Sequence, residues 1–304
     1  MAKRHVISLF DLTSAEIRQI FAISADLKAE CMSGLRRPLL SGHVLGLLFE
    51  KPSLRTRVSF EAAMAHLGGN SMFLGPDVGW GSREPVPDFA RVLSQYVDVV
   101  ICRAKTHQRV EELAQNATCS VVNGLTDQAH PCQALTDLFT LQEIAGGLES
   151  ARLAYVGDAN NVACSLAVAC AKLGVSFAIA HPPDYGFRRV FLDQLAAAAP
   201  NLDLLQTSDP FEAVHGATAV YTDVWASMGQ EAERDRRLAA FAEYQVDARV
   251  MAAAHEDARF LHCLPARRGE EVATEVIDGP QSAVIQQAEN RMHVQKGLLQ
   301  WLLG

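Results

Sequence analysis

Apolar residues along the chain follow two alternating patterns, short continuous runs and longer segments with helical spacing. The first continuous run, residues 44–49, predicts a buried strand. Beyond it, apolar side chains recur at Phe60, Met64 and Leu67, and Gly68 predicts the end of that helix. The same alternation predicts further strands at 71–74, 98–104, 119–122, 152–157, 176–180, 217–224 and 259–265, and helices at 88–96, 108–116, 130–144 and 160–174.

Strands that alternate with helices predict an α/β fold built on parallel sheets, because parallel strands need crossover connections. Gly146-Gly147 interrupts the alternation, and the pattern restarts with the strand at Arg152. We therefore expect two domains, residues 1–146 and 147–282, each a mostly parallel sheet flanked by helices. The apolar C-terminal helix, 283–304, is expected to pack back on the first domain.

Composition narrows the class of protein. With 304 residues, of which 49% are apolar, the chain can bury substantial cores. A net charge of −8 disfavours a nucleic-acid binder, and no apolar run approaches the length of a membrane span. The seven cysteines are scattered without a C-x-x-C pair, so neither a disulfide framework nor structural zinc is expected. These features favour a cytoplasmic protein.

The segment Ser53-Leu54-Arg55-Thr56-Arg57 lies where the first strand passes into a helix. Free backbone N–H groups, two hydroxyls and two guanidiniums meet at this helix N-terminus, an arrangement suited to a phosphate. The alternative is a solvated arginine pair beside an ordinary helix cap. The segment is not a Walker loop, because no Gly-x-x-x-x-Gly-Lys precedes the helix.

Other polar residues lie where predicted strands end or helices begin, the side of an open α/β sheet that binds ligands. Each has a simple alternative: His130 and Asn161 as helix caps, Asp223 as a surface acid, Cys263 as a small core residue. The glycine turn at Gly157 does not continue into Gly-x-Gly-x-x-Gly, so NAD binding is disfavoured. Two stretches read as loops, the Gly- and Pro-rich residues 75–87 and the charged residues that lead to Arg237.

Three motifs resemble those of the aspartate/ornithine carbamoyltransferase family. Ser53 to Arg57 is similar to the family's phosphate motif, and His130-Pro-Cys-Gln133 and His262-Cys-Leu-Pro265 match its other two signatures. Asp223-x-x-x-Ser227-Met228-Gly229 is similar to the ornithine-specific loop. The resemblance implies a carbamoyl-phosphate domain followed by an ornithine domain, linked by interdomain helices. It also implies a homotrimer with shared active sites, no metal or organic cofactor, and a reaction that converts carbamoyl phosphate and L-ornithine to L-citrulline and phosphate in arginine metabolism.

The resemblance also implies a role for each site residue. Catalytic roles fall to Arg103, His130, Asp223 and Cys263, with Arg103 and His130 polarising the carbamoyl oxygen. Asp223 is expected to pair with the α-ammonium of ornithine. The implied carbamoyl-phosphate ligands are Ser53, Leu54 (through its backbone N–H), Arg55, Thr56, Arg103, His130, Gln133, Cys263, Leu264 and Arg291, and the implied ornithine ligands are Asn161, Asp223, Ser227 and Met228.

The chain departs from the family pattern at two places. Leu54 stands where many relatives carry Thr, and residues 75–87 lack the glutamine expected there in ornithine enzymes. Arg83 or Ser82 is a candidate replacement. The same loop holds no lysine, which weighs against aspartate as the substrate. The remaining alternatives are a sister enzyme acting on N-acetyl- or N-succinyl-ornithine and a catalytically silent subunit on the same fold.

Overall fold

The computed structural model describes residues 3–226 and 231–304 of the chain. The chain divides into two compact units, Met1–Leu135 with Asn290–Gly304 (unit 1) and Thr136–Glu289 (unit 2). The divisions fall inside two helices, α5 (Pro131–Ala145) and α12 (Val284–Leu303), so each of these helices contributes to both units. Among the helices of the described residues, none is long and apolar enough to cross a lipid bilayer.

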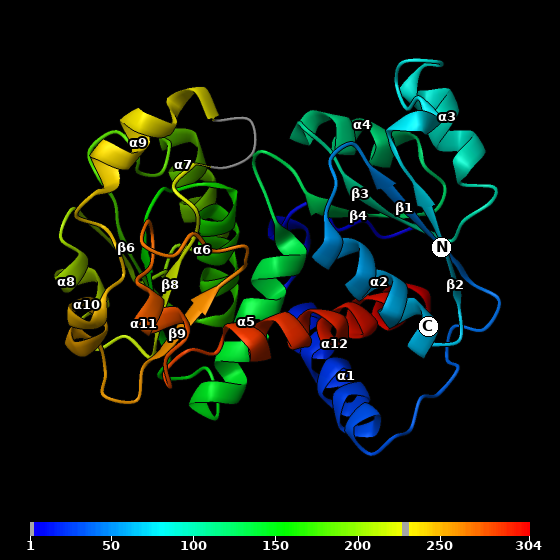
Figure 1. Cartoon of the computed structure of the whole chain (residues 1–304). Helices are drawn as coiled ribbons and strands as arrows, with labels where there is room; N and C mark the ends of the chain where they lie inside the picture. The colour runs from blue at the N-terminus through cyan, green and yellow to red at the C-terminus, as the bar shows by residue number, and fades with distance from the viewer. Residues whose placement is uncertain (1–2, 227–230) are drawn as a thin grey trace. The chain divides into compact units, whose positions relative to one another are not determined.

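Unit 1 is built on a four-stranded parallel sheet with strand order β2-β1-β3-β4. The central strands are almost wholly buried because helices cover the sheet (Figure 1), which explains their continuous apolar sequences. The strands are β1 (Val44–Phe49), β2 (Asn70–Leu74), β3 (Val99–Arg103) and β4 (Ser120–Leu125), and the helices are α1 (Ser14–Met32), α2 (Leu54–His66), α3 (Val86–Leu93) and α4 (His107–Asn116).

Unit 2 is built on a five-stranded parallel sheet with strand order β7-β6-β5-β8-β9. Its strands are β5 (Arg152–Val156), β6 (Ser176–Ala180), β7 (Leu204–Thr207), β8 (Ala219–Thr222) and β9 (Arg259–His262). Its helices besides parts of α5 and α12 are α6 (Asn161–Leu173), α7 (Arg189–Ala198), α8 (Pro210–Val214), α9 (Arg234–Phe241), α10 (Ala248–Ala253) and α11 (Thr274–Ile277).

Each sheet contains one position where the strand order reverses. In unit 1 the chain adds β2 on one side of β1 and β3 on the other, and in unit 2 it adds β6 and β8 on opposite sides of β5. The connections that leave neighbouring strands at such a position diverge, which opens a crevice at the carboxyl ends of the strands. Ser53 follows β1 and Arg103 ends β3, while Asn160 follows β5 and Asp223 follows β8.

The predicted α/β fold class is confirmed, with two parallel sheets flanked by helices. The prediction of a loop leading to Arg237 is wrong, since α9 begins at Arg234. The Arg237 side chain is buried and donates to Asp158 Oδ2 at 2.7 Å and to the Trp225 carbonyl at 3.1 Å. This mostly charged helix also buries Phe241 in the core of unit 2, so Arg237 and one apolar side chain together attach it.

The stretch 75–87 includes the short 3₁₀ helix η2 (Pro76–Val78), and α3 begins at Val86. Trp80 is buried in the core of unit 1 beside Phe89. The Arg109 guanidinium lies 4.5 Å from the Trp80 ring centre and donates to the Trp80 carbonyl at 2.8 Å. Trp80, Val86 and the hydrogen bond from Arg109 therefore attach this stretch to its own unit.

The C-terminal part of α12 packs against α1 within unit 1. Lys296 Nζ donates to the Leu27 carbonyl at 2.9 Å, and Trp301 Nε1 donates to Gln19 Oε1 at 3.2 Å. Gly297 allows the close approach, because a Cβ atom built there would lie 2.0 Å from Ser24 Oγ and 2.8 Å from the Ile20 carbonyl oxygen. The Ser24 hydroxyl itself donates to the Ile20 carbonyl at 2.6 Å, so it is held in place.

We expect Gly297→Ala to destabilise the protein by about 1–3 kcal/mol, the usual cost of overpacking a core. On a solvent-exposed helix face, a Gly→Ala change stabilises the protein by up to about 1 kcal/mol. A loss of stability in Gly297→Ala would therefore indicate the close contact between α12 and α1. Gly46→Ala is the matched control, since its Cβ would meet Val97 at 3.4 Å, an ordinary contact. Thermal unfolding midpoints at one protein concentration compare the two variants. Equal midpoints would contradict the close α1–α12 packing.

Candidate functional site

The N-terminus of α2 carries the predicted anion-binding segment. Ser53 is the N-cap, and its Oγ accepts from the Thr56 backbone N–H at 3.4 Å and lies 3.1 Å from Thr56 Oγ1. Leu54 begins the helix with its side chain exposed, so its contribution can come only from the backbone N–H, and Arg55 is half-buried. This helix end offers oriented donors and the positive end of the helix dipole.

Arg291, on α12, connects this helix end to α5. Its Nη2 donates to Thr56 Oγ1 at 3.1 Å, and its Nη1 donates to Gln133 Oε1. All three side chains are almost fully buried in unit 1. Because Thr56 Oγ1 accepts from the guanidinium, its own hydroxyl proton is available to a ligand. Residues more than 230 positions apart in the sequence therefore form one polar cluster.

Arg103 brings further positive charge to the same cluster, and His130 lies beside it. Arg103 ends β3, His130 directly precedes α5, and both are buried. Burial lowers the pKa of His130 well below its ordinary value, and the positive charges of Arg291 and Arg103 lower it further. The imidazole is therefore neutral at neutral pH and can donate from one ring nitrogen without adding charge. The cluster suits an anion that also presents a carbonyl oxygen.

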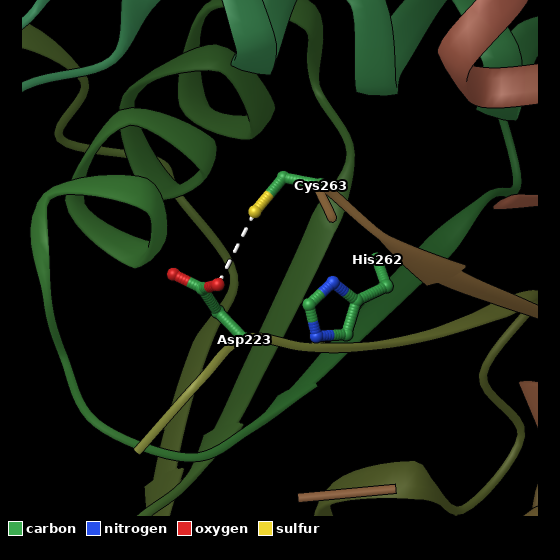
Figure 2. A group of neighbouring side chains, drawn as sticks. All are labelled: Asp223, His262 and Cys263. Carbon is green, nitrogen blue, oxygen red and sulfur yellow. Dashed lines mark hydrogen bonds between the residues drawn. The ribbon is translucent and has the colours of Figure 1, made fainter. Parts of the chain in front are cut away.

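In unit 2, Asp223 and Cys263 lie together just beyond the ends of β8 and β9. Figure 2 shows their side chains pointing toward each other, with Cys263 Sγ 3.2 Å from Asp223 Oδ1. Asn160 Nδ2 donates to the other carboxylate oxygen at 2.9 Å, and the Val224 backbone N–H donates to Oδ1 at 2.8 Å. The carboxylate is thereby held in a single orientation while remaining an acceptor for a cationic ligand.

The state of the Cys263 thiol follows from these neighbours. Burial raises the pKa of Cys263 well above its ordinary value, and the Asp223 carboxylate raises it further. The group is therefore a protonated thiol that donates to Asp223, and it is a poor nucleophile. This environment differs from that of a reactive cysteine, which needs nearby positive charge.

Ligand atoms of Asp223, His262 and Cys263 lie within 4.8 Å of one another, a spacing that a metal ion could bridge. Both imidazole nitrogens of His262 already have hydrogen-bond partners: Nδ1 accepts from the Leu264 backbone N–H at 2.9 Å, and Nε2 lies 3.3 Å from Glu271 Oε1. A metal ion would have to displace one of these bonds, so the group fits a hydrogen-bonded network better than an ion site.

The structure thus brings the predicted site residues together as two groups. In unit 1, Ser53, Thr56, Gln133 and Arg291 are joined by hydrogen bonds, and Arg103 and Arg291 act electrostatically on His130. In unit 2, Asp223 contacts Cys263, whereas Asn161 is the half-buried first residue of α6. Leu264 follows Cys263 with a positive φ of 56°. Ser227 and Met228 lie outside the described residues.

The asparagine pair at 160–161 reads either as ligand-facing amides or as helix caps, and the family resemblance implies a site role for Asn161. The structure shows that Asn160 contacts Asp223. Its Oδ1 caps α6 by accepting from Val162 N at 2.9 Å and Ala163 N at 3.1 Å, while its Nδ2 reaches Asp223. An asparagine directly before an apolar helix is a cap signal in the sequence. The sequence signal does not reveal that the remaining amide hydrogens meet a carboxylate 63 residues away.

Comparison with protein-family models gives two adjacent matches. The carbamoyl-P binding domain of aspartate/ornithine carbamoyltransferase matches residues 4–143, and the Asp/Orn binding domain matches residues 149–302. The chain is 50% identical to an ornithine carbamoyltransferase of Bacillus subtilis, with 99% of this chain and 94% of the relative covered. It is 47% identical to another of Anoxybacillus flavithermus, with 98% and 96% covered.

Solved structures give the same result. The chain resembles ornithine carbamoyltransferase from Pyrococcus furiosus with a TM-score of 0.96 and 44% identity, covering 100% of this chain and 98% of that one. For the enzyme from Thermus thermophilus the TM-score is 0.90 and the identity 40%, with both chains fully covered. The resemblance that the sequence motifs indicated is confirmed, and the chain belongs to the aspartate/ornithine carbamoyltransferase family.

Proposed function

We propose that the chain transfers the carbamoyl group of carbamoyl phosphate to the δ-amine of L-ornithine, giving L-citrulline and phosphate. The observation that carries this proposal is the buried polar cluster in which Arg291 donates to both Thr56 and Gln133, beside His130. Ornithine as the acceptor is supported by the relatives described above, which are ornithine carbamoyltransferases. The family motifs suggest a role for each residue, and the hydrogen bonds and burial of the described site residues support those roles.

Carbamoyl phosphate is proposed to bind to the site residues of unit 1. We assign the carbamoyl-phosphate-binding domain to residues 1–146 together with the C-terminal helix 283–304. The phosphate would accept from the Ser53 and Thr56 hydroxyls, the Leu54 backbone N–H and the Arg55 guanidinium. Arg103 and neutral His130 would donate to the carbamoyl oxygen as negative charge develops on it. Gln133, which Arg291 orients, would accept from the carbamoyl NH₂ through Oε1.

Ornithine is assigned to the domain formed by residues 147–282. The Asp223 carboxylate would pair with the α-ammonium, since it is buried and already oriented by three donors. Asn161, Ser227 and Met228 are proposed as further ornithine contacts. The backbone carbonyls of Cys263 and Leu264 would accept from the carbamoyl nitrogen, so the role of Cys263 in catalysis does not require a thiolate.

Transfer requires an uncharged δ-amine to attack the carbamoyl carbon while the phosphate leaves. Neither His130 nor Cys263 has a pKa suited to take the amine proton near neutral pH, because burial keeps both groups uncharged. The departing phosphate is therefore proposed to take the proton from the attacking nitrogen. Preorganised donors at the developing oxyanion typically stabilise such a transition state by about 2.7–4 kcal/mol each.

A homotrimer with shared active sites is proposed as the assembly. Support comes from apolar side chains that unit 1 exposes on α2 and on the edge strand β2, namely Leu54, Val58, Met72 and Phe73. An exposed apolar edge strand is a hazard unless another surface covers it. A cytoplasmic location and a role in arginine metabolism are proposed as well; the seven free cysteines are compatible with a reducing compartment.

The substrate assignment predicts citrulline formation from carbamoyl phosphate and L-ornithine, with little turnover of N-acetyl- or N-succinyl-ornithine. The physical reason is that an acylated α-nitrogen carries no positive charge for Asp223 to bind. Colorimetric detection of the ureido product with each amine measures this directly. Activity confined to the acylated amines would transfer the assignment to a sister enzyme, and no activity with any amine would favour a silent subunit.

Replacing Arg55 with Ala is expected to raise KM for carbamoyl phosphate and lower kcat together, with kcat/KM reduced by about 100-fold or more. A phosphate contact both binds the substrate and orients it for attack. Arg91→Ala is the control, because that arginine is exposed on α3 of the same unit and pairs only with Asp88 at 3.5 Å. Initial rates over both substrates give the parameters, and unchanged values would remove Arg55 from the site.

The proton-transfer proposal predicts how the rate depends on pH. His130 has a lowered pKa and Cys263 a raised one, so both stay uncharged between pH 7 and 9. The δ-amine resembles a lysine, with a pKa of about 10.4, so its uncharged fraction rises about tenfold per pH unit over that range. We expect kcat/KM for ornithine to follow this fraction. A plateau set by an enzyme group with a pKa between 7 and 9 would contradict the proposal.

A further inference from the structure

The chain turns sharply after β9, at Cys263 and Leu264. Leu264 adopts a positive φ of 56°, a conformation that is uncommon for residues other than glycine. Its backbone N–H donates to Nδ1 of His262 at 2.9 Å. The imidazole therefore holds the peptide between Cys263 and Leu264 in its orientation, and with it the direction of the Cys263 carbonyl.

Glu271 holds the imidazole from the other side. Its Oε1 lies 3.3 Å from His262 Nε2, and both side chains are completely buried. Because Nδ1 accepts from a backbone N–H, hydrogen-bond logic assigns the ring proton to Nε2, where it is donated to the carboxylate. The same Oε1 accepts from the Arg267 backbone N–H at 2.6 Å. One carboxylate oxygen thus fixes the imidazole and the chain segment that follows the turn.

The backbone of His262 is also held within unit 2. Its N–H donates to Gln287 Oε1 at 2.9 Å, and Gln287 Nε2 donates to Asp137 Oδ1 at 2.6 Å. With the backbone fixed at this point, the ring has one remaining freedom, rotation about its side-chain torsions. The hydrogen bond to the Glu271 carboxylate prevents this rotation. Without the carboxylate, the buried ring N–H would lose a charge-assisted hydrogen bond.

We propose that Glu271 is a positioning residue for carbamoyl transfer: acting through His262, it orients the Cys263–Leu264 peptide. Glu271 touches no substrate, because its side chain has no exposed surface. The inference rests on the proposed function, since the orientation of the Cys263 carbonyl matters to the rate only if this carbonyl accepts from the reacting nitrogen. If the inference is right, loss of the Glu271–His262 hydrogen bond lowers kcat by more than any loss of folding stability would explain.

The first test replaces Glu271 with Gln, which keeps the shape and one acceptor oxygen but removes the charge. We expect kcat to fall by about 10- to 100-fold. The KM for carbamoyl phosphate and the inhibition constant of inorganic phosphate should change by less than about threefold, because the phosphate contacts lie in unit 1. Glu275→Gln, an exposed site at the start of α11, is the matched control.

A pair of His262 variants separates positioning from general structural support. In His262→Asn the amide oxygen takes the place of Nδ1 and can still accept from the Leu264 N–H. In His262→Gln the amide reaches toward Glu271 and leaves that N–H without its acceptor. We expect the Asn variant to retain at least about fivefold more kcat than the Gln variant, even where their thermal midpoints are equal.

Several outcomes would overturn the inference. One is a Glu271→Gln enzyme with kcat within twofold of the wild type, whether or not its thermal midpoint is lower. Another is equal kcat in the two His262 variants, which decides the question if Glu271→Gln does not fold. Wild-type protein that forms no citrulline would instead remove the proposed function, and the positioning role with it, so the two failures are distinguishable.

Discussion

The strand order of the two parallel sheets determines which loops can form a site. In each sheet, successive strands are added first on one side of a central strand and then on the other; the central strand is β1 in unit 1 and β5 in unit 2. Parallel strands end on the same side, so the segments that follow them meet there. The phosphate-type helix cap and Arg103 meet at the first reversal, and Asn160 and Asp223 meet at the second. Residues that follow neighbouring strands at this position of the sheet therefore lie close enough to act together.

The two groups differ in electrostatic character in a way that matches two kinds of ligand. Unit 1 gathers Arg103 and Arg291 around a buried imidazole, and their charges lower the pKa of His130. Such a cluster favours an anion. Unit 2 presents a carboxylate surrounded by neutral donors, and that carboxylate raises the pKa of the Cys263 thiol. This group favours a cation, and neither His130 nor Cys263 changes its charge near neutral pH.

Hydrogen bonds from neighbouring side chains fix the orientation of the proposed site residues in both units. Arg291 orients Gln133 and Thr56, Asn160 orients Asp223, and Glu271 orients His262. Arg291 and Asn160 lie far in the sequence from the residues that they orient, whereas Glu271 lies nine residues from His262. Arg291 and Glu271 are buried and Asn160 is half-buried, so loss of any of them would leave a polar partner unsatisfied. A site built in this way is expected to lose rate before it loses affinity when a supporting residue is changed.

Local sequence determined most of the elements and the family. Continuous apolar runs identified β1, β3, β5 and β6, because strands covered on both faces carry little polar signal. The local pattern missed β7 and the helices α7, α8, α10 and α11, and it assigned the start of α9 to a loop. β7, α8, α10 and α11 are brief, and α9 is mostly charged and is stabilised by tertiary contacts such as that of Arg237 with Asp158.

For the site, short local motifs identify the residue types that carry the chemistry. The contacts between those residues, and their protonation states, follow from the folded structure. Arg291 reaches Thr56 across 235 positions, Asn160 contacts Asp223 across 63, and the Cys263 thiol stays protonated. Contacts and pKa values depend on burial and distance in three dimensions, and neither quantity can be read from order along the chain.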